Sequence, residues 1–149
     1  MNKELQPALR QPLVSGCLFR AIKDDMSNPC WLKGTLHIRN DSFGKVYTIE
    51  YEAGEYIYNQ NSVIPSTIGQ NTGLLDKLGR EIFEGDIVRI WHERDDDEGF
   101  FTIGIVEYSP AEFYIRGDGH SITCHFHYNN SEREIIGNIH DNPELLPER

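Results

Sequence analysis

Apolar and polar residues alternate along much of this chain, and residues that favour turns interrupt the alternation repeatedly. Within 45–51, Tyr47, Ile49 and Tyr51 fall on one side of an extended strand and the residues between them on the other. A period of two is the geometry of a β-strand. No segment shows the three-to-four-residue spacing of a helix longer than a turn or two. The sequence therefore predicts a mainly β protein.

The turns divide the chain into short predicted strands and one hairpin. The segments expected to be extended are 13–22, 31–38, 45–51, 72–83, 87–91, 100–108, 112–116, 121–128 and 134–139. Five short strands after Gly85, joined by turns and one charged loop, predict a small SH3-like β-barrel in the C-terminal half. The strands before it predict an N-terminal β-meander. Asn142 is expected to cap one short helical turn that begins at Pro143.

These elements suggest three segments. Residues 1–12 are polar and contain two prolines, and we expect a loosely ordered leader there. Residues 13–68 are predicted to form the β-meander lobe and residues 69–149 the SH3-like barrel, the two together making one unit.

Several glycines and aspartates mark the predicted turns. Asp76 is suited to open a type I turn through its carboxylate, and Gly79 is suited to the left-handed conformation that follows it. The expected structural turn residues are Gly73, Asp76, Gly79, Gly85 and Asp86. For these positions we predict an architectural role: the glycines relieve backbone strain, and the aspartates bind nearby amides.

Charge and cysteine content restrict the partners. The 149 residues carry a formal charge of −10, and the cations are scattered, so binding to nucleic acid is unlikely. Three separated cysteines, Cys17, Cys30 and Cys124, indicate reduced thiols rather than a disulfide framework. No stretch resembles a signal peptide or reaches membrane-spanning length. We therefore expect a cytoplasmic protein without a membrane partner.

Two stretches resemble a known family. IGQNTGLLDKLGREIFEGDIV at 68–88 and EIIGNIHDNPELL at 134–146 are similar to motifs of the YopX family of bacteriophage and prophage proteins. The segments 19–21 and 31–34 fit the family's opening more loosely, Asn71 stands where an aromatic residue is common, and the leader before Phe19 is longer than usual. The resemblance implies a fold that contains a β-barrel and a phage setting, so we expect the protein in the cytoplasm of a bacterial host. It brings no catalytic residues to carry over.

Two clusters resemble metal sites superficially. His125 and His127 would share one face of a strand, but Cys124 would point to the other, and a tetrahedral site needs further ligands. The acidic run within 93–98 lacks the ligand spacing of a calcium loop and predicts a solvated hairpin tip. Nucleophile and phosphate-binding motifs are also absent from the sequence. We therefore predict no metal, no cofactor and no catalytic residues.

The leading hypothesis is a non-enzymatic phage accessory protein that binds another protein and self-associates through exposed strand edges. Trp91, Tyr108 and Tyr114, with Tyr128, are the candidate interaction surface, core packing being the alternative for them. A competing hypothesis is a nucleic-acid-binding barrel with a local basic surface. The residues expected to form it are Lys77, Arg80, Arg89 and Arg116. A small enzyme with an unrecognised site is the third hypothesis.

Overall fold

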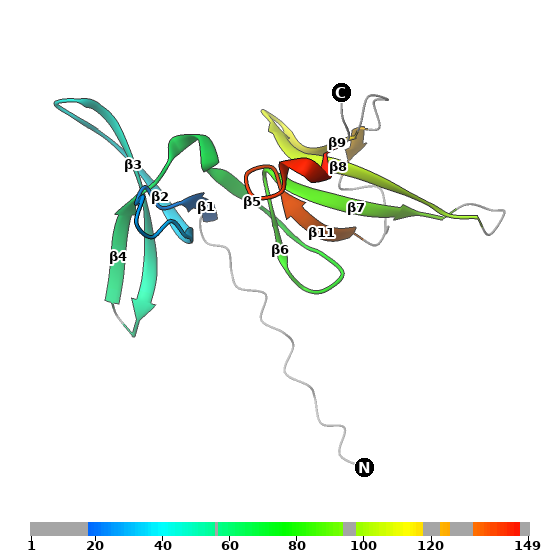
Figure 1. The fold of residues 1–149 in the computed structure, drawn as a ribbon, viewed down its shortest axis with the longest axis horizontal. Helices are drawn as coiled ribbons and strands as arrows, with labels where there is room; N and C mark the ends of the chain where they lie inside the picture. The colour runs from blue at the N-terminus through cyan, green and yellow to red at the C-terminus, as the bar shows by residue number, and fades with distance from the viewer. Residues whose placement is uncertain (1–17, 56, 94–97, 118–122, 126–132, 147–149) are drawn as a thin grey trace, which may run out of the picture.

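The protein consists of two antiparallel β-sheets that lie side by side (Figure 1). The computed structural model describes residues 18–55, 57–93, 98–117 and 133–146, and the backbone of 123–125. The predicted leader therefore lies outside the described residues. Strands make up most of the described residues and the two helical elements are three-residue 3-10 turns, which confirms the mainly β prediction.

The first sheet has six strands in the order β4-β3-β2-β1-β5-β6. Their bounds are β1 Leu18–Ile22, β2 Trp31–Asp41, β3 Gly44–Gly54, β4 Ile57–Ser62, β5 Gly69–Leu75 and β6 Glu81–Phe83. A short 3-10 turn, Pro65–Thr67, precedes β5. The core of this sheet is built on Ala21, Leu32, Ile49 and Val63, against which Tyr47 and Tyr51 pack. Tyr47, Ile49 and Tyr51 therefore lie on one side of β3, as predicted, and Ile49 is buried in the core.

The second sheet has five strands in the order β10-β9-β8-β7-β11. Their bounds are β7 Asp86–His92, β8 Phe100–Ser109, β9 Glu112–Gly117, β10 Thr123–His125 and β11 Arg133–Asn138. A 3-10 turn follows at Pro143–Leu145, so the predicted helical turn exists. Asn142 does not cap that turn with its side chain, and this part of the prediction is wrong. Its Oδ1 instead accepts a hydrogen bond from the backbone N–H of Asn138 (3.3 Å), which ties the turn to β11.

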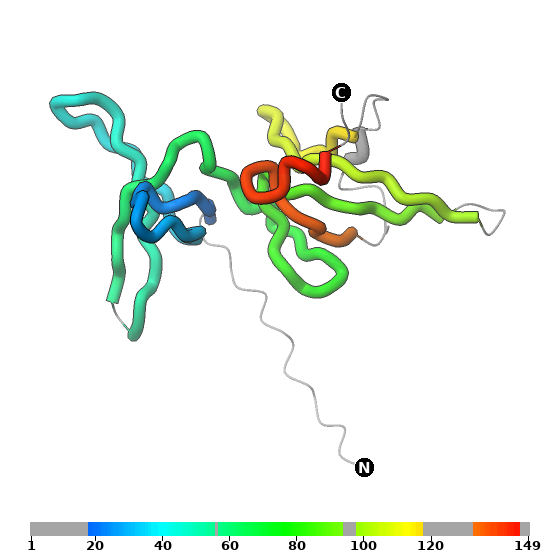
Figure 2. Tube along the Cα trace, viewed as in Figure 1, coloured from blue at the N-terminus to red at the C-terminus, as the bar shows by residue number. Residues whose placement is uncertain are grey.

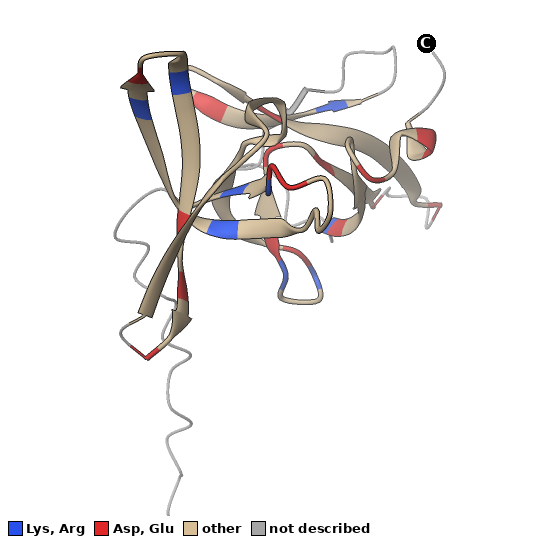
Figure 3. Ribbon diagram, turned by 60° about the vertical axis from the view of Figure 1, so that its left-hand side comes forward, with Lys and Arg blue, Asp and Glu red and all other residues tan. Residues whose placement is uncertain are grey.

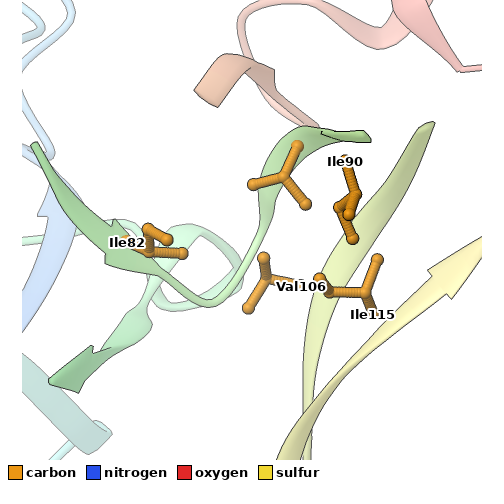
Figure 4. Packing of buried hydrophobic residues seen from close by; sticks show 5 residues of the cluster. Ile82, Ile90, Val106 and Ile115 are labelled. Atoms are coloured by element: carbon orange, nitrogen blue, oxygen red, sulfur yellow. The ribbon is translucent and has the colours of Figure 1, made fainter. Parts of the chain in front are cut away.

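Strands β5 and β6 belong to one sheet by their backbones and to the other by their side chains. Their main chains pair with each other and, through β5, with β1. Ile82, however, lies in one apolar cluster with Val88, Ile90, Val106 and Ile115 of the five-stranded sheet (Figure 4). Burying such aliphatic side chains stabilises the fold by about 1.5–3 kcal/mol each. The β5–β6 hairpin therefore covers one face of the five-stranded sheet.

The predicted SH3-like barrel is not confirmed. The five-stranded sheet ends at β10 on one side and at β11 on the other, and the two end strands do not pair with each other. Closure would require hydrogen bonds between the first and last strands. Here β5 and β6 are committed to the six-stranded sheet instead, so both sheets stay open.

The ion pair between Arg20 and Asp86 joins the two sheets. Arg20 on β1 donates through Nη2 to Oδ1 of Asp86, the first residue of β7, over 2.6 Å. The Arg20 guanidinium lies between the rings of Trp31 (4.8 Å) and Phe83 (5.0 Å). Trp31 reaches the C-terminal segment as well, because its indole N–H donates to Asp141 Oδ2 over 2.7 Å. The junction therefore combines charge, stacking and hydrogen bonds from both sheets.

Among the residues that the structure describes, no helix combines the length and the apolar character that crossing a membrane requires.

Strands β8 and β9 meet closely at a pair of opposed glycines, Gly104 and Gly117. A Cβ atom at Gly104 would lie 2.6 Å from Cγ2 of Ile115 and 2.7 Å from the carbonyl oxygen of Arg116. At Gly117 an added Cβ atom would be 3.6 Å from its nearest neighbour, which is an ordinary contact. Of these two glycines, the packing requires only Gly104.

We predict that Gly104→Ala lowers the free energy of unfolding by roughly 1–3 kcal/mol because the backbone of β9 must move away. Gly117→Ala, directly opposite, is the matched control and should change it by no more than about 0.5 kcal/mol. Urea unfolding followed by circular dichroism measures both. Equal losses in the two variants would show that the close approach at Gly104 does not constrain the sheet.

Candidate functional site

The five-stranded sheet has one covered face and one that is partly exposed. Its inner face carries Val88, Ile90, Val106 and Ile115, which pack under Ile82. Because side chains alternate along each strand and directly paired residues share a face, the remaining positions form an outer face. The outer face consists of Ile87, Arg89, Trp91, Phe101, Ile103, Ile105, Glu107, Tyr114, Arg116 and Glu134.

An aromatic pair marks one end of the outer face. Trp91 and Phe101 are directly opposed on β7 and β8, with ring centroids 4.7 Å apart and planes tilted by 59°. Strands β7 and β8 extend away from the six-stranded sheet as a long hairpin (Figure 2), and the pair lies one residue from the end of β7 at His92 and the start of β8 at Phe100. The Arg89 guanidinium lies 4.9 Å from the Phe101 ring centroid. Phe101 is nevertheless 56% exposed, so a large aromatic surface faces solvent.

Two cations share one carboxylate beside this pair. Glu134 on β11 accepts a hydrogen bond from Arg89 Nη2 (2.5 Å) and lies 3.2 Å from Lys77 Nζ. The hydrogen bonds from Arg89 and then from Lys77 lower the pKa of Glu134, because they favour the ionised form. These three side chains line a hollow of about 220 Å³ with Trp91 and Phe101. The lining of the hollow therefore combines two aromatic rings with three charged side chains that are held by ion pairs.

A second polar group lies on the outer face across β8 and β9. The Tyr114 hydroxyl donates to Glu107 Oε2 over 2.7 Å, and Arg116 Nη2 lies 2.7 Å from the other oxygen of that carboxylate. The bond to Glu107 raises the pKa of Tyr114, because ionisation would place two negative charges side by side. These three side chains line a hollow of about 320 Å³. Ser66 and Ile68, from the segment just before β5, line it as well.

The structure brings together two of the three aromatic residues predicted to form an interaction surface. Trp91 and Tyr114 both lie on the outer face. Tyr108 alternates to the opposite side, where its ring meets Phe113 at a centroid distance of 5.1 Å, although 48% of the residue is exposed. Tyr128 lies outside the described residues.

The predicted turn residues occupy backbone positions that suit their types. Gly73, Gly79 and Gly85 have φ angles of 78°, 79° and 86°, which is the left-handed region that favours glycine. Asp86 Oδ2 accepts a hydrogen bond from the backbone N–H of Phe83 (2.8 Å) while its other oxygen binds Arg20.

Asp76 organises a turn that also covers a sheet edge. Its carboxylate accepts hydrogen bonds from the backbone N–H groups of Leu78 (3.0 Å), Arg80 (2.9 Å) and Ile135 (3.2 Å). The Arg80 side chain lies 2.7 Å from the same carboxylate and donates to the carbonyl of Ile135 on β11 (2.7 Å). Burial raises the pKa of Asp76, but the hydrogen bonds from Arg80, Ile135 and Leu78 together hold it below its ordinary value.

The four cations proposed for nucleic-acid binding are each paired with a carboxylate. Lys77 and Arg89 bind Glu134, Arg80 binds Asp76 and Arg116 binds Glu107. Figure 3 shows Lys and Arg positions dispersed among acidic ones rather than gathered in one stripe. A phosphate would have to compete with these carboxylates.

Several residues of the two clusters that resemble metal sites lie outside the described part of the chain. His127 and the acids at 95–97 lie outside the described residues, as do the side chains of Cys124 and His125. Within the described part of the chain, no three His, Cys, Asp or Glu side chains gather around one point.

Sequence reasoning missed Phe101 and Arg20. The position of Phe101 opposite Trp91 depends on the register between β7 and β8, which the sequence does not contain. Arg20 had a signal: it is a lone cation inside the apolar strand Leu18–Ile22, and an arginine there needs an acidic partner. The identity of that partner, Asp86, required the fold.

Comparison with known proteins assigns the family. The model of the family described as YopX protein matches residues 19–147. The chain belongs to the YopX family. A crystal structure of protein EF1440 from Enterococcus faecalis has a similar fold, with a TM-score of 0.51 and 23% identity over 89% of this chain and 99% of that one. No curated protein sequence matches this YopX family member.

The Asp76 carboxylate gives the YopX chain a testable pH dependence. Because the pKa of Asp76 is lower in the folded than in the unfolded state, its stabilisation is present at neutral pH and declines as the pH falls through the folded value. We predict that Asp76→Asn lowers the free energy of unfolding by about 3 kcal/mol near pH 7, and by less near about pH 3.

Urea unfolding of both proteins at the two pH values measures this difference. Asp24→Asn, which alters an exposed carboxylate, is the control and should stay within about 0.5 kcal/mol of the unsubstituted protein. A loss in Asp76→Asn that does not shrink at low pH would contradict the assigned role.

Proposed function

We propose that this YopX family member is a phage or prophage accessory protein that catalyses no reaction and acts by binding another protein through the outer face. The observation that carries the proposal is the exposed ring of Phe101, which packs against the half-buried Trp91 and lies beside Arg89. Aromatic residues and arginine are enriched at protein interfaces and supply most of the binding energy there. Tyr114 and Arg116 on β9 add a second aromatic residue and a second arginine to the same face of the sheet.

The outer face suits a protein segment that presents an apolar side chain flanked by polar groups. The hollow of about 220 Å³ beside Phe101 is large enough for an aliphatic or aromatic side chain. Glu134, Arg89 and Lys77 hold one another in position, so a partner meets pre-oriented charges that fix its register. The rigid strands of the sheet limit the entropy lost on binding.

Protein is a better target than nucleic acid for electrostatic reasons. A net charge of −10 repels a phosphate backbone over distances up to about a Debye length, roughly 10 Å at 0.1 M salt. Lys77, Arg89 and Arg116 already neutralise carboxylates on the outer face. They are therefore poorly placed to replace the counterions condensed on a nucleic acid, which is the main driving force for binding a phosphate backbone.

Phe101→Ala tests the proposal with little risk to the fold, because Phe101 is largely exposed. The tagged protein is used to capture proteins from phage-infected and uninfected host cells, and the recovered protein is purified and titrated against each variant. We predict that Phe101→Ala weakens its binding by roughly 30-fold or more, the effect of removing an interface residue worth about 2 kcal/mol.

Phe43→Ala is the control, since it removes an exposed aromatic ring from the turn between β2 and β3, on the six-stranded sheet rather than on the outer face. It should bind like the unsubstituted protein. The proposal fails if no protein is recovered, or if the recovered protein binds Phe101→Ala at full strength. Recovery of DNA or RNA that salt displaces would favour the nucleic-acid alternative instead.

A further inference from the structure

Strand β4 ends the six-stranded sheet and leaves one side of its backbone unpaired by any described strand (Figure 1). The direction of its backbone groups follows from two hydrogen bonds at its end. Val63 donates to the Tyr47 carbonyl on β3 (3.0 Å), while the Ser62 carbonyl accepts from Asp24 on the opposite side (2.9 Å). Since these directions alternate, the N–H and C=O groups of Tyr58 and Gln60 point away from β3.

The other end strands of the described sheets are short or covered, and the part of β2 that β1 leaves unpaired, 36–41, carries the charged Arg39 and Asp41. Strands β6 and β10 have three residues each. Strand β11 has six, but the Asp76 turn covers it: Lys77 N–H donates to the Arg133 carbonyl (2.8 Å), and Arg80 binds the Ile135 carbonyl. Natural proteins protect exposed edges in such ways because an open edge pairs with another strand. Strand β4 lacks this protection along Tyr58 and Gln60.

The composition of β4 is unusual for an edge in such an acidic protein. Its sequence, Ile-Tyr-Asn-Gln-Asn-Ser, has neither a charge nor a proline, the two residue classes that usually block edge pairing. Tyr58 is 64% exposed. Because the whole chain carries a charge of −10, two copies repel each other over most of their surfaces. The uncharged β4 edge lets them approach.

We propose that two copies of this chain pair through β4, antiparallel, around a two-fold axis at Asn59. Tyr58 of each copy then faces Gln60 of the other. Both residues have their backbone groups directed outward, so the pairing forms four N–H···O=C bonds and joins two six-stranded sheets into one. Because the contact is isologous, it uses both free edges and stops at a dimer.

The neighbouring charges are compatible with this pairing. Glu50 and Glu52 lie on β3, opposite Gln60 and Tyr58 respectively. Across the dimer, three strand spacings of about 4.8 Å separate Glu50 of one copy from Glu52 of the other, which is roughly 14 Å. That distance exceeds the Debye length of about 10 Å at 0.1 M salt, so the repulsion between them is largely screened. The register at Asn59 thus forms its hydrogen bonds without bringing acids together.

The first test is the mass in solution, measured by light scattering over a wide concentration range. The unsubstituted protein should show twice the chain mass of 17.2 kDa. Asn59→Lys places two like-charged side chains on facing positions whose Cβ atoms are about 5 Å apart, and should weaken dimerisation at least tenfold. Ile38→Lys adds the same charge at an exposed strand position away from β4 and should leave the dimer intact. A monomeric unsubstituted protein, or an Asn59→Lys variant that dimerises normally, overturns the proposal.

The second test fixes the register. In a background with Cys17, Cys30 and Cys124 replaced by serine, Asn59→Cys should form a disulfide-linked dimer under mild oxidation, because the two Cβ atoms face each other across the axis. Ile38→Cys in the same background should not. A dimer in which Asn59→Cys fails to cross-link uses another interface and contradicts the pairing through β4.

Discussion

Two opposite charges meet at the junction of the sheets with almost no access to water. Asp86 is 1% exposed, and Arg20 reaches it from the other sheet. Burial raises the pKa of Asp86, and the nearby charge of Arg20 lowers it again only in part. A buried carboxylate without its partner typically destabilises a protein by about 3–5 kcal/mol. The fold therefore depends on keeping β1 beside the start of β7.

That placement determines which surfaces remain available. With Arg20 bound to Asp86, β5 pairs with β1, and the β5–β6 hairpin is held over the inner face of the five-stranded sheet. Phe101 is consequently exposed to solvent on the outer side, next to the half-buried Trp91. At the far end of the other sheet, β4 keeps its free edge. The ion pair of Arg20 and Asp86 thus lies between the outer face and the β4 edge, the two surfaces suited to contact with other chains.

The sequence predicts local features of this fold well and its closure poorly. The alternation around Ile49 and the glycine turn at Gly79 are local, because backbone geometry and short-range burial determine them. Whether a run of strands closes into a barrel depends instead on which strands pair at the ends, and β5 pairs with β1 rather than completing a barrel. Strand β4 was not predicted, because its polar residues give no apolar period.

In the candidate site, too, residue types could be predicted from the sequence and their spatial arrangement could not. Trp91 and Tyr114 were recognisable as aromatic residues on strands, but their common face and the exposure of Phe101 depend on strand register. The pairing of Arg89 with Glu134 joins strands far apart in the chain, so the sequence indicated a free cation where the structure has an ion pair. Membership of the YopX family was visible in motifs because they contain the turn around Asp76 and the corner at Asp86.

The central claim is that Arg20 and Asp86 act as one unit that joins the two sheets. A double-mutant cycle with Arg20→Met and Asp86→Asn, measured by urea unfolding, tests it most directly. We expect the double variant to be less destabilised than the sum of the single losses by about 1–3 kcal/mol, since removing both charges leaves none unpaired. Strictly additive losses would mean that the two residues stabilise the protein independently, and the ion pair would not be what holds the sheets together.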